Sequence, residues 1–148
     1  MAKVFIVTQA RLKSTRLPEK ILKEIQGKSL LQIHLESLKK SKYSKNLIVA
    51  TTNEKGIEKV IRLLKYMSIK YYQGSNHDVL DRYYQAALSY KPDYIVNFAA
   101  QGMVAESWLN PTHWYETNLL SQVKLHDNLR KRNFIKKYLH VTTPEVYG

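Results

Sequence analysis

Five short apolar runs, separated by amphipathic stretches, constrain the fold of this 148-residue chain most strongly. The runs are rich in β-branched and aromatic residues and are continuous rather than alternating: VFIV (4–7), LIVAT (47–51), IKYY (69–72), YIVNFAA (94–100) and YLHVTT (138–143). Continuous apolar strands are typical of a parallel sheet that is covered on both faces. The sequence therefore predicts a mainly parallel sheet of about five strands.

Helical patterns fill the intervals between these runs. Apolar residues recur at helical spacing over residues 29–41, 57–67, 78–90 and 114–132. Asp78 is placed to cap the third of these helices, where Asp81 and Arg82 are interpreted as a salt-bridged first turn, and Asn110-Pro111 is placed to begin the fourth. Strict alternation of strands and helices predicts a doubly wound, Rossmann-like α/β fold with helices on both faces of the sheet. Because no linker or repeat interrupts the pattern, residues 1–148 are interpreted as a single α/β domain.

Composition excludes several classes of protein. The absence of cysteine rules out a disulfide framework and thiolate metal sites, and the five histidines show no ligand spacing, so no metal site is proposed. No apolar run is long enough to span a membrane, and the first 20 residues lack a signal peptide, so we expect a cytoplasmic protein without a membrane partner. The net charge is +12, and residues 1–93 hold 18 Lys and Arg against 8 Asp and Glu. Such a surface attracts nucleic acid, anionic membranes or phosphorylated small molecules, and charge alone does not choose among them.

A basic segment, QARLKSTRLPEK (9–20), follows the first predicted strand and contains no glycine. In a doubly wound sheet, ligands bind beyond the carboxyl ends of the strands, where this loop would lie. Its four cations, Arg11, Lys13, Arg16 and Lys20, offer charge-assisted hydrogen bonds to phosphate. Without glycines it is neither a Walker loop nor a dinucleotide loop. The segment therefore predicts a phosphate site of another kind, and the alternative is a solvated basic turn.

The loop QARLKSTRLPEKIL and the later run YYQGSNHDVLDRYYQAA (71–87) together resemble the sugar-activating cytidylyltransferases, the CMP-sugar synthetase and spore-coat polysaccharide group. The resemblance covers about residues 3–95. It implies that the loop holds the triphosphate of CTP, with Mg²⁺, while a sugar displaces pyrophosphate. Arg11 and Lys20 would then be the catalytic phosphate contacts. The implied nucleotide-binding residues are Gln9, Ala10, Arg11, Ser14, Arg16, Lys20, Gly74 and Ser75.

Residues 93–148 show a second resemblance, through YIVNFAAQGMVAESWLNPTHWYETN and YLHVTTPEVYG, to the middle of an extended short-chain dehydrogenase of the nucleotide-sugar dehydratase and epimerase kind. It implies that Ala99 and Ala100 line NAD, that Thr143 hydrogen-bonds the sugar, and that Glu145 is the glutamate of the dehydratase acid pair. The two resemblances meet within the strand Tyr94–Phe98. Both families place the fourth strand beside the first, so the implied strand order is 3-2-1-4-5.

Each resemblance supplies half of an active site. The Gly-Asp that holds Mg²⁺ in cytidylyltransferases is absent after the fourth strand, where the first carboxylate is Glu106, and the chain stops at Gly148 before a Tyr-x-x-x-Lys motif. Whether the chain turns over therefore stays open, and a truncated chain is favoured. The preferred function is a nucleotidyltransferase-like protein of nucleotide-sugar and surface polysaccharide biosynthesis that binds CTP phosphates. The alternatives are a fragment of an NAD-dependent dehydratase or epimerase and, ranked last, a non-enzymatic nucleic-acid binder. Core or helix-face packing is the preferred interpretation of Trp108, Trp114 and Tyr115; the alternative is an exposed aromatic patch for a partner chain, and a homodimer is left open.

Overall fold

The computed structural model describes residues 3–13, 17–98, 100 and 104–141, and the chain divides into two compact units. One unit is Val4–Tyr90, and the other combines Met1–Lys3 with Lys91–Gly148. Parallel strands alternate with helices in both, which confirms the predicted α/β class. The prediction of one domain from 1 to 148 stays a prediction. No helix in the described parts of the chain is long and apolar enough to cross a membrane.

The Val4–Tyr90 unit is built on a parallel sheet of three strands in the order β1-β4-β5. These are β1 (Ile6–Ala10), β4 (Leu47–Thr52) and β5 (Lys70–Gly74), and all six residues of the central strand β4 are buried. These three strands correspond to the first three apolar runs of the sequence. The step that would complete the order 3-2-1-4-5, a pairing of Val4–Val7 with Tyr94–Phe98, stays a prediction.

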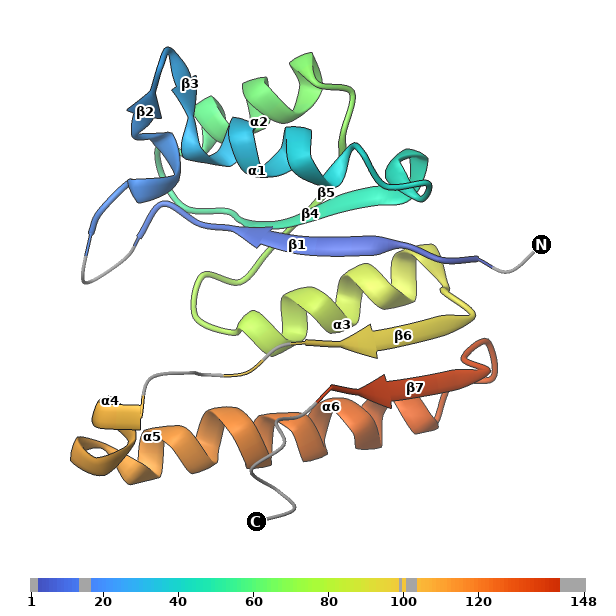
Figure 1. Ribbon diagram of the computed structural model, residues 1–148. Helices are drawn as coiled ribbons and strands as arrows, with labels where there is room; N and C mark the ends of the chain where they lie inside the picture. Colours follow the sequence, from blue (N-terminus) through green and yellow to red (C-terminus); the bar gives the residue numbers. More distant parts are fainter. Residues whose placement is uncertain (1–2, 14–16, 99, 101–103, 142–148) are drawn as a thin grey trace. The chain divides into compact units, whose positions relative to one another are not determined.

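Three helices cover this sheet: α1 (Leu30–Leu38), α2 (Glu58–Tyr66) and α3 (Val79–Tyr90). Figure 1 shows α1 and α2 on one face and α3 on the other. The main core lies on the first face, between the sheet and the helices α1 and α2. Leu47 and Val49 of β4 both point into it, since alternate residues of a strand point to the same side. Its buried residues are Ala10, Leu12, Leu31, Leu35, Leu47, Val49, Ile57, Val60, Leu64, Met67 and Ile69.

A small antiparallel hairpin, which no pattern in the sequence predicts, lies between β1 and α1. It pairs β2 (Glu24–Ile25) with β3 (Lys28–Ser29), and a short 3₁₀ helix, η1 (Lys20–Leu22), precedes it. The two turn residues, Gln26 and Gly27, have φ angles of 50° and 75°. Two-residue hairpin loops favour this left-handed backbone because it matches the twist of the strands, and glycine adopts it without steric cost. Ser29 then caps α1, with its Oγ accepting from the Gln32 amide at 3.1 Å.

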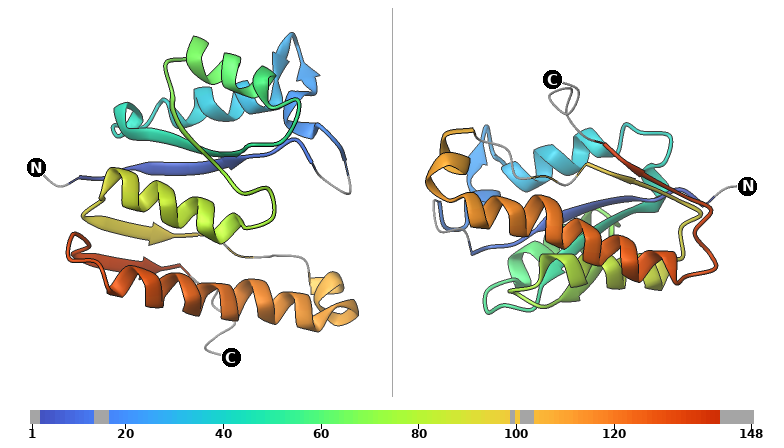
Figure 2. Two further views of the ribbon diagram at one scale, coloured as in Figure 1. Left: turned by 180° about the vertical axis from the view of Figure 1, so that it is seen from behind. Right: turned by 90° about the horizontal axis from the view of Figure 1, so that it is seen from below.

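The other unit pairs β6 (Tyr94–Asn97) in parallel with β7 (Lys137–His140). Between them lie α4 (Val104–Leu109), α5 (Pro111–Tyr115), a π-helical turn η3 (Glu116–Leu120) and α6 (Ser121–Arg130). Figure 2 shows α5, η3 and α6 as one continuous rod beside β7. The helix expected over 114–132 therefore exists, but it begins at Pro111 and contains a π turn.

Candidate phosphate-binding site

The carboxyl ends of β1, β4 and β5 lie at one edge of the three-stranded sheet. Ala10 is opposite Thr51, and Thr52 is opposite Gly74, so the segments that follow the three strands leave the sheet at the same level. The Thr51 hydroxyl also donates to the Ala10 carbonyl at 2.8 Å. The sheet thus brings the basic loop after β1 together with the segments after β4 and β5.

The basic loop is fastened at its base by the buried carboxylate of Glu54, which follows β4. One Glu54 oxygen accepts from the Leu12 amide at 2.8 Å, from the Thr52 hydroxyl at 2.7 Å and from the Lys13 amide at 3.5 Å. The Leu12 side chain is buried in the core, and its carbonyl accepts from the Glu19 amide at 3.0 Å. Both ends of the segment from Leu12 to Glu19 are therefore fixed.

Glu54 is held in its charged form. Burial raises the pKa of its carboxyl, but the hydrogen bonds from Thr52, Leu12 and Lys13, with the Lys13 charge, outweigh burial and leave the pKa below its ordinary value. This carboxylate therefore occupies the amides of Leu12 and Lys13. Arg11, Lys13 and Lys20 are all exposed and cationic.

A second brace comes from Arg82 of α3, whose side chain is fully buried. Its Nη1 donates to the Ser75 carbonyl, and its Nη2 donates to the Gln9 Oε1 at 3.2 Å. Burial lowers the pKa of the Arg82 guanidinium, and the positive charge of Arg11 lowers it further. The arginine thus connects the end of β1 to the segment after β5.

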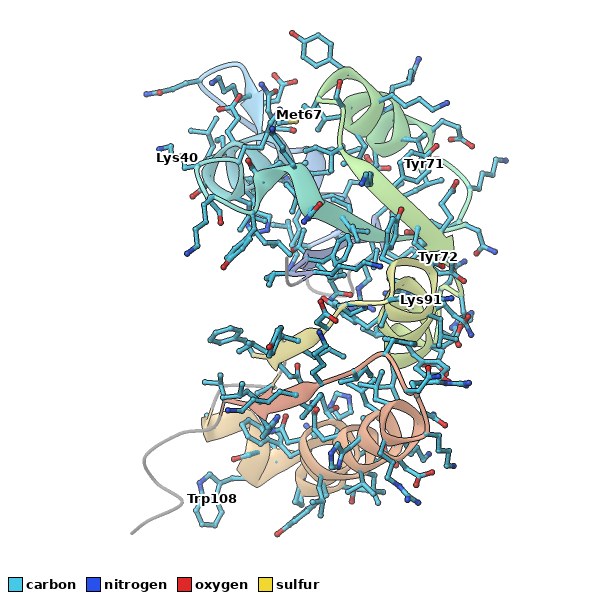
Figure 3. The ribbon with its side chains drawn as sticks, turned by 90° about the vertical axis from the view of Figure 1, so that its right-hand side faces the viewer. Lys40, Met67, Tyr71, Tyr72, Lys91 and Trp108 are labelled. Carbon is cyan, nitrogen blue, oxygen red and sulfur yellow. The ribbon has the colours of Figure 1, made fainter. Side chains whose placement is uncertain are left out.

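Gly74 leaves the space that the Arg82 side chain occupies. A Cβ atom built on Gly74 would lie 3.0 Å from the Arg82 Cγ and 2.9 Å from the Cε1 of Tyr72, which projects from β5 (Figure 3). Both distances are shorter than an ordinary carbon–carbon contact. The glycine is therefore required by close packing.

The segment after Gly74 is folded on itself before α3 begins. The Ser75 Oγ accepts from the amides of His77 and Asp78, each at 3.2 Å. The Asp78 Oδ1 accepts from the Asp81 amide at 2.8 Å, which confirms the predicted cap. Arg82, expected to be a salt-bridged residue at the start of this helix, instead lies in the interior.

The structure brings together most of the described residues that the sequence predicts for the transferase site. Gln9 and Ala10 end β1, Arg11 follows them, and Gly74 and Ser75 stand at the matching end of β5. Lys20, the last residue of the basic segment, is exposed at the start of η1. Ala100 follows β6 in the other unit and is exposed. The remaining predicted residues lie outside the described part of the chain: Ser14, Arg16, Ala99, Thr143 and Glu145.

Sequence reasoning missed the two residues that brace the site. Glu54 had one usable signal, since it is the first carboxylate after the second strand and would face a basic loop across the same edge of the sheet. Arg82 had a weaker one: it is at helical spacing from Val79 and Ala86, which places it on the apolar side of the helix.

The Mg²⁺ that the first resemblance implies stays a prediction. The described residues contain no group of three or more His, Asp or Glu side chains arranged around one point. The buried carboxylate of Glu54 already accepts hydrogen bonds from two amides and a hydroxyl. No catalytic step is therefore assigned to a metal held by these residues.

Comparison with known proteins finds relatives of this chain. The chain is 40% identical to an uncharacterized protein from Methanocaldococcus jannaschii over 94 residues, which is 64% of this chain and 39% of that protein. It is 49% identical over 55 residues, 37% of this chain and 22% of the relative, to the 3-deoxy-manno-octulosonate cytidylyltransferase of Francisella tularensis subsp. novicida. The chain thus spans between about a fifth and two fifths of the length of these curated relatives.

The solved structures that resemble this chain also include a cytidylyltransferase. A cytidylyltransferase from Leptospira borgpetersenii superposes with a TM-score of 0.59 and 39% identity, over 63% of this chain and 39% of that one. A UDP-glucose 4-epimerase from Bifidobacterium longum reaches a TM-score of 0.48 at 24% identity, over 77% of this chain and 33% of that one, a similarity too low to indicate a shared function. The dehydrogenase resemblance of residues 93–148 therefore stays a prediction.

A family model described as cytidylyltransferase matches residues 4–139, and so continues well beyond the strand in which the two resemblances meet. This match includes the basic loop, Glu54 and Arg82. Because it covers most of the 148 residues, the chain belongs to the cytidylyltransferase family.

Proposed function

We propose that the chain binds the phosphates of CTP through the loop Gln9–Lys20 and supplies the nucleotide-binding part of a nucleotidyltransferase in nucleotide-sugar biosynthesis. The observation that carries the proposal is the fastening of the loop by Glu54 at the carboxyl end of β1. The hydrogen bonds that hold Leu12 and Glu19 reduce the conformational entropy that these two residues lose when a ligand binds. The exposed cations of the loop can therefore use their attraction to phosphate for affinity.

The charges suit a triphosphate. Among the described residues, Arg11, Lys13 and Lys20 form none of the four ion pairs. Guanidinium and ammonium groups make short, charge-assisted bonds to phosphate oxygens. The same groups would stabilise the negative charge that builds up on pyrophosphate when it leaves, which is the main demand of this class of reaction.

We propose a sugar acid as the first acceptor to test. This choice follows the relatives named 3-deoxy-manno-octulosonate cytidylyltransferase, which match this chain over 55 residues. CTP binding is tested before the acceptor.

We expect CTP with Mg²⁺ to raise the thermal unfolding temperature of the purified chain, and to do so more than NAD. Arg11→Ala and Lys20→Ala should each weaken CTP binding about tenfold, because each removes a charged partner of the phosphates. The measurement is a titration followed by thermal shift and by calorimetry.

Lys40→Ala is the matched control, since it removes the same charge from an exposed residue (Figure 3) after α1, on the path to the amino end of β4. Equal weakening by all three substitutions would mean that only the overall charge attracts CTP, and would contradict the proposal. Stabilisation by NAD alone would transfer the assignment to the dehydrogenase resemblance.

A further inference from the structure

The contact between Arg82 and Gln9 fixes more than the position of the Gln9 side chain. A guanidinium carries only donors, whereas a glutamine amide has an acceptor oxygen on one side and a donor NH₂ on the other. The hydrogen bond at 3.2 Å joins the Arg82 Nη2 to the Gln9 Oε1. If the Gln9 amide were rotated by half a turn, its NH₂ group would face the N–H groups of Arg82, and two donors cannot form a hydrogen bond. Arg82 therefore favours the orientation in which the Gln9 Oε1 faces it.

In that orientation the two N–H groups of Gln9 are directed away from Arg82. Gln9 is exposed, next to the last residue of β1, and Arg11 follows two residues later. Arg82 itself is fully buried and so does not meet a ligand in this arrangement. The pair therefore presents a donor from Gln9 at the edge of the sheet that carries the basic loop.

Burial of the Arg82 side chain costs folding free energy, so stability alone does not account for this residue. It is a buried cation, its Nε has no hydrogen-bond partner among the described residues, and it requires Gly74 beneath it. Apolar residues of similar volume often replace buried charged groups without loss of stability. A role in setting the Gln9 amide explains why a donor-only group is placed here.

We propose that Arg82 is a positioning residue that holds the Gln9 amide with its N–H groups toward the nucleotide, so that Gln9 donates to an acceptor oxygen of CTP. This inference rests on the proposed CTP site and adds how that site is set. A purely structural Arg82 would stabilise the unit without any particular effect on Gln9.

The first test is Gln9→Glu in the full chain. A carboxylate still accepts from Arg82, so the stability to urea should be unchanged or higher, but the outward donor is replaced by a negatively charged acceptor. Titration with CTP and Mg²⁺ should then show affinity at least about tenfold lower. Ser89→Asp adds the same charge at an exposed position late in α3 and should change the affinity less than about twofold.

The second test is a double-mutant cycle with Gln9→Ala and Arg82→Lys. Lysine keeps the charge but cannot bond Gln9 and Ser75 together with one planar fork. We expect Gln9→Ala to weaken CTP binding about tenfold in the wild type and less than about threefold beside Arg82→Lys.

Equal losses in both backgrounds, or full CTP affinity in Gln9→Glu, would overturn the positioning role and leave the proposed function standing. A wild-type chain that does not bind CTP would overturn both. If Arg82→Lys does not fold, Gln9→Glu decides the matter alone, because it changes an exposed side chain and retains the acceptor for Arg82.

Discussion

Glu54→Ala is expected to lower the free energy of unfolding by about 2–3 kcal/mol and to weaken CTP binding about tenfold. The substitution removes the acceptor of the Leu12 amide and of the Thr52 hydroxyl, both of which are buried. Hydrogen bonds to a charged group stabilise by about 1.5–3 kcal/mol, and a buried donor left without a partner is costly. Urea unfolding and CTP calorimetry measure the two effects.

Two further variants separate the anchor from a general loss of a carboxylate. Glu54→Gln keeps the shape and an acceptor oxygen but not the charge, so its effect should be about half as large. Glu24→Gln changes an exposed carboxylate on β2 and should alter neither quantity. If Glu54→Ala is as stable as the wild type, the loop is not held in the way described.

The pH dependence gives an independent check on the same residue. Because the pKa of Glu54 is lowered in the folded state, its contribution is complete above the ordinary value of 4.5 and is lost as the pH falls through the folded value. Asp93, Asp127 and Glu36 also have lowered pKa values, so the wild type alone does not isolate Glu54. The difference in stability between the wild type and Glu54→Gln should be constant near pH 7 and shrink below about pH 4.5. A difference that grows on acidification would contradict the assignment.

Leu64→Ala should destabilise the Val4–Tyr90 unit by about 3 kcal/mol. Leu64 is fully buried on α2 within the core between α1, α2 and the sheet. Leucine-to-alanine changes at such positions lose the transfer free energy of the side chain and leave a cavity, at a total cost of about 2–5 kcal/mol.

Tyr66→Ala is the control on the same helix, because this tyrosine is 83% exposed. Its effect should stay within about 0.5 kcal/mol. Thermal and urea unfolding report both variants. A small effect of Leu64→Ala would show that the two helices are not packed on the sheet as described.

Much of this fold follows from simple patterns in the sequence. Each predicted strand in the described chain is found within a few residues of its apolar run. Burial on two faces explains the continuous apolar residues of β4, which is buried along its whole length. β1 is the instructive difference: it begins at Ile6 and continues through Thr8 and Gln9, whose polar side chains gave no strand signal. Ladder pairing with β4, which is wholly buried, overrides their propensity.

The cations of the candidate site were predictable from the sequence, whereas Glu54 and Arg82, which hold the site in place, were not. The cationic loop stands out in the sequence because its charges follow a strand instead of lying on a helix face. Glu54 and Arg82 act through partners that are 42 and 73 residues away in sequence, at Leu12 and Gln9. No local pattern records such partners, since they depend on the register of β1, β4 and β5. The hairpin β2–β3 was missed for a simpler reason, as two-residue strands are too short to show alternation.

Because β4 is the central strand, hydrogen exchange of its backbone amides should respond to ligand binding at the end of the sheet. These amides lie between β1 and β5 and are buried, so they should exchange with deuterium only when the whole Val4–Tyr90 unit opens. A nucleotide that binds only the folded unit reduces that opening, by about a hundredfold at a hundred times its dissociation constant. Deuterium uptake at Leu47–Thr52 can therefore measure CTP affinity without any label on the loop that binds it.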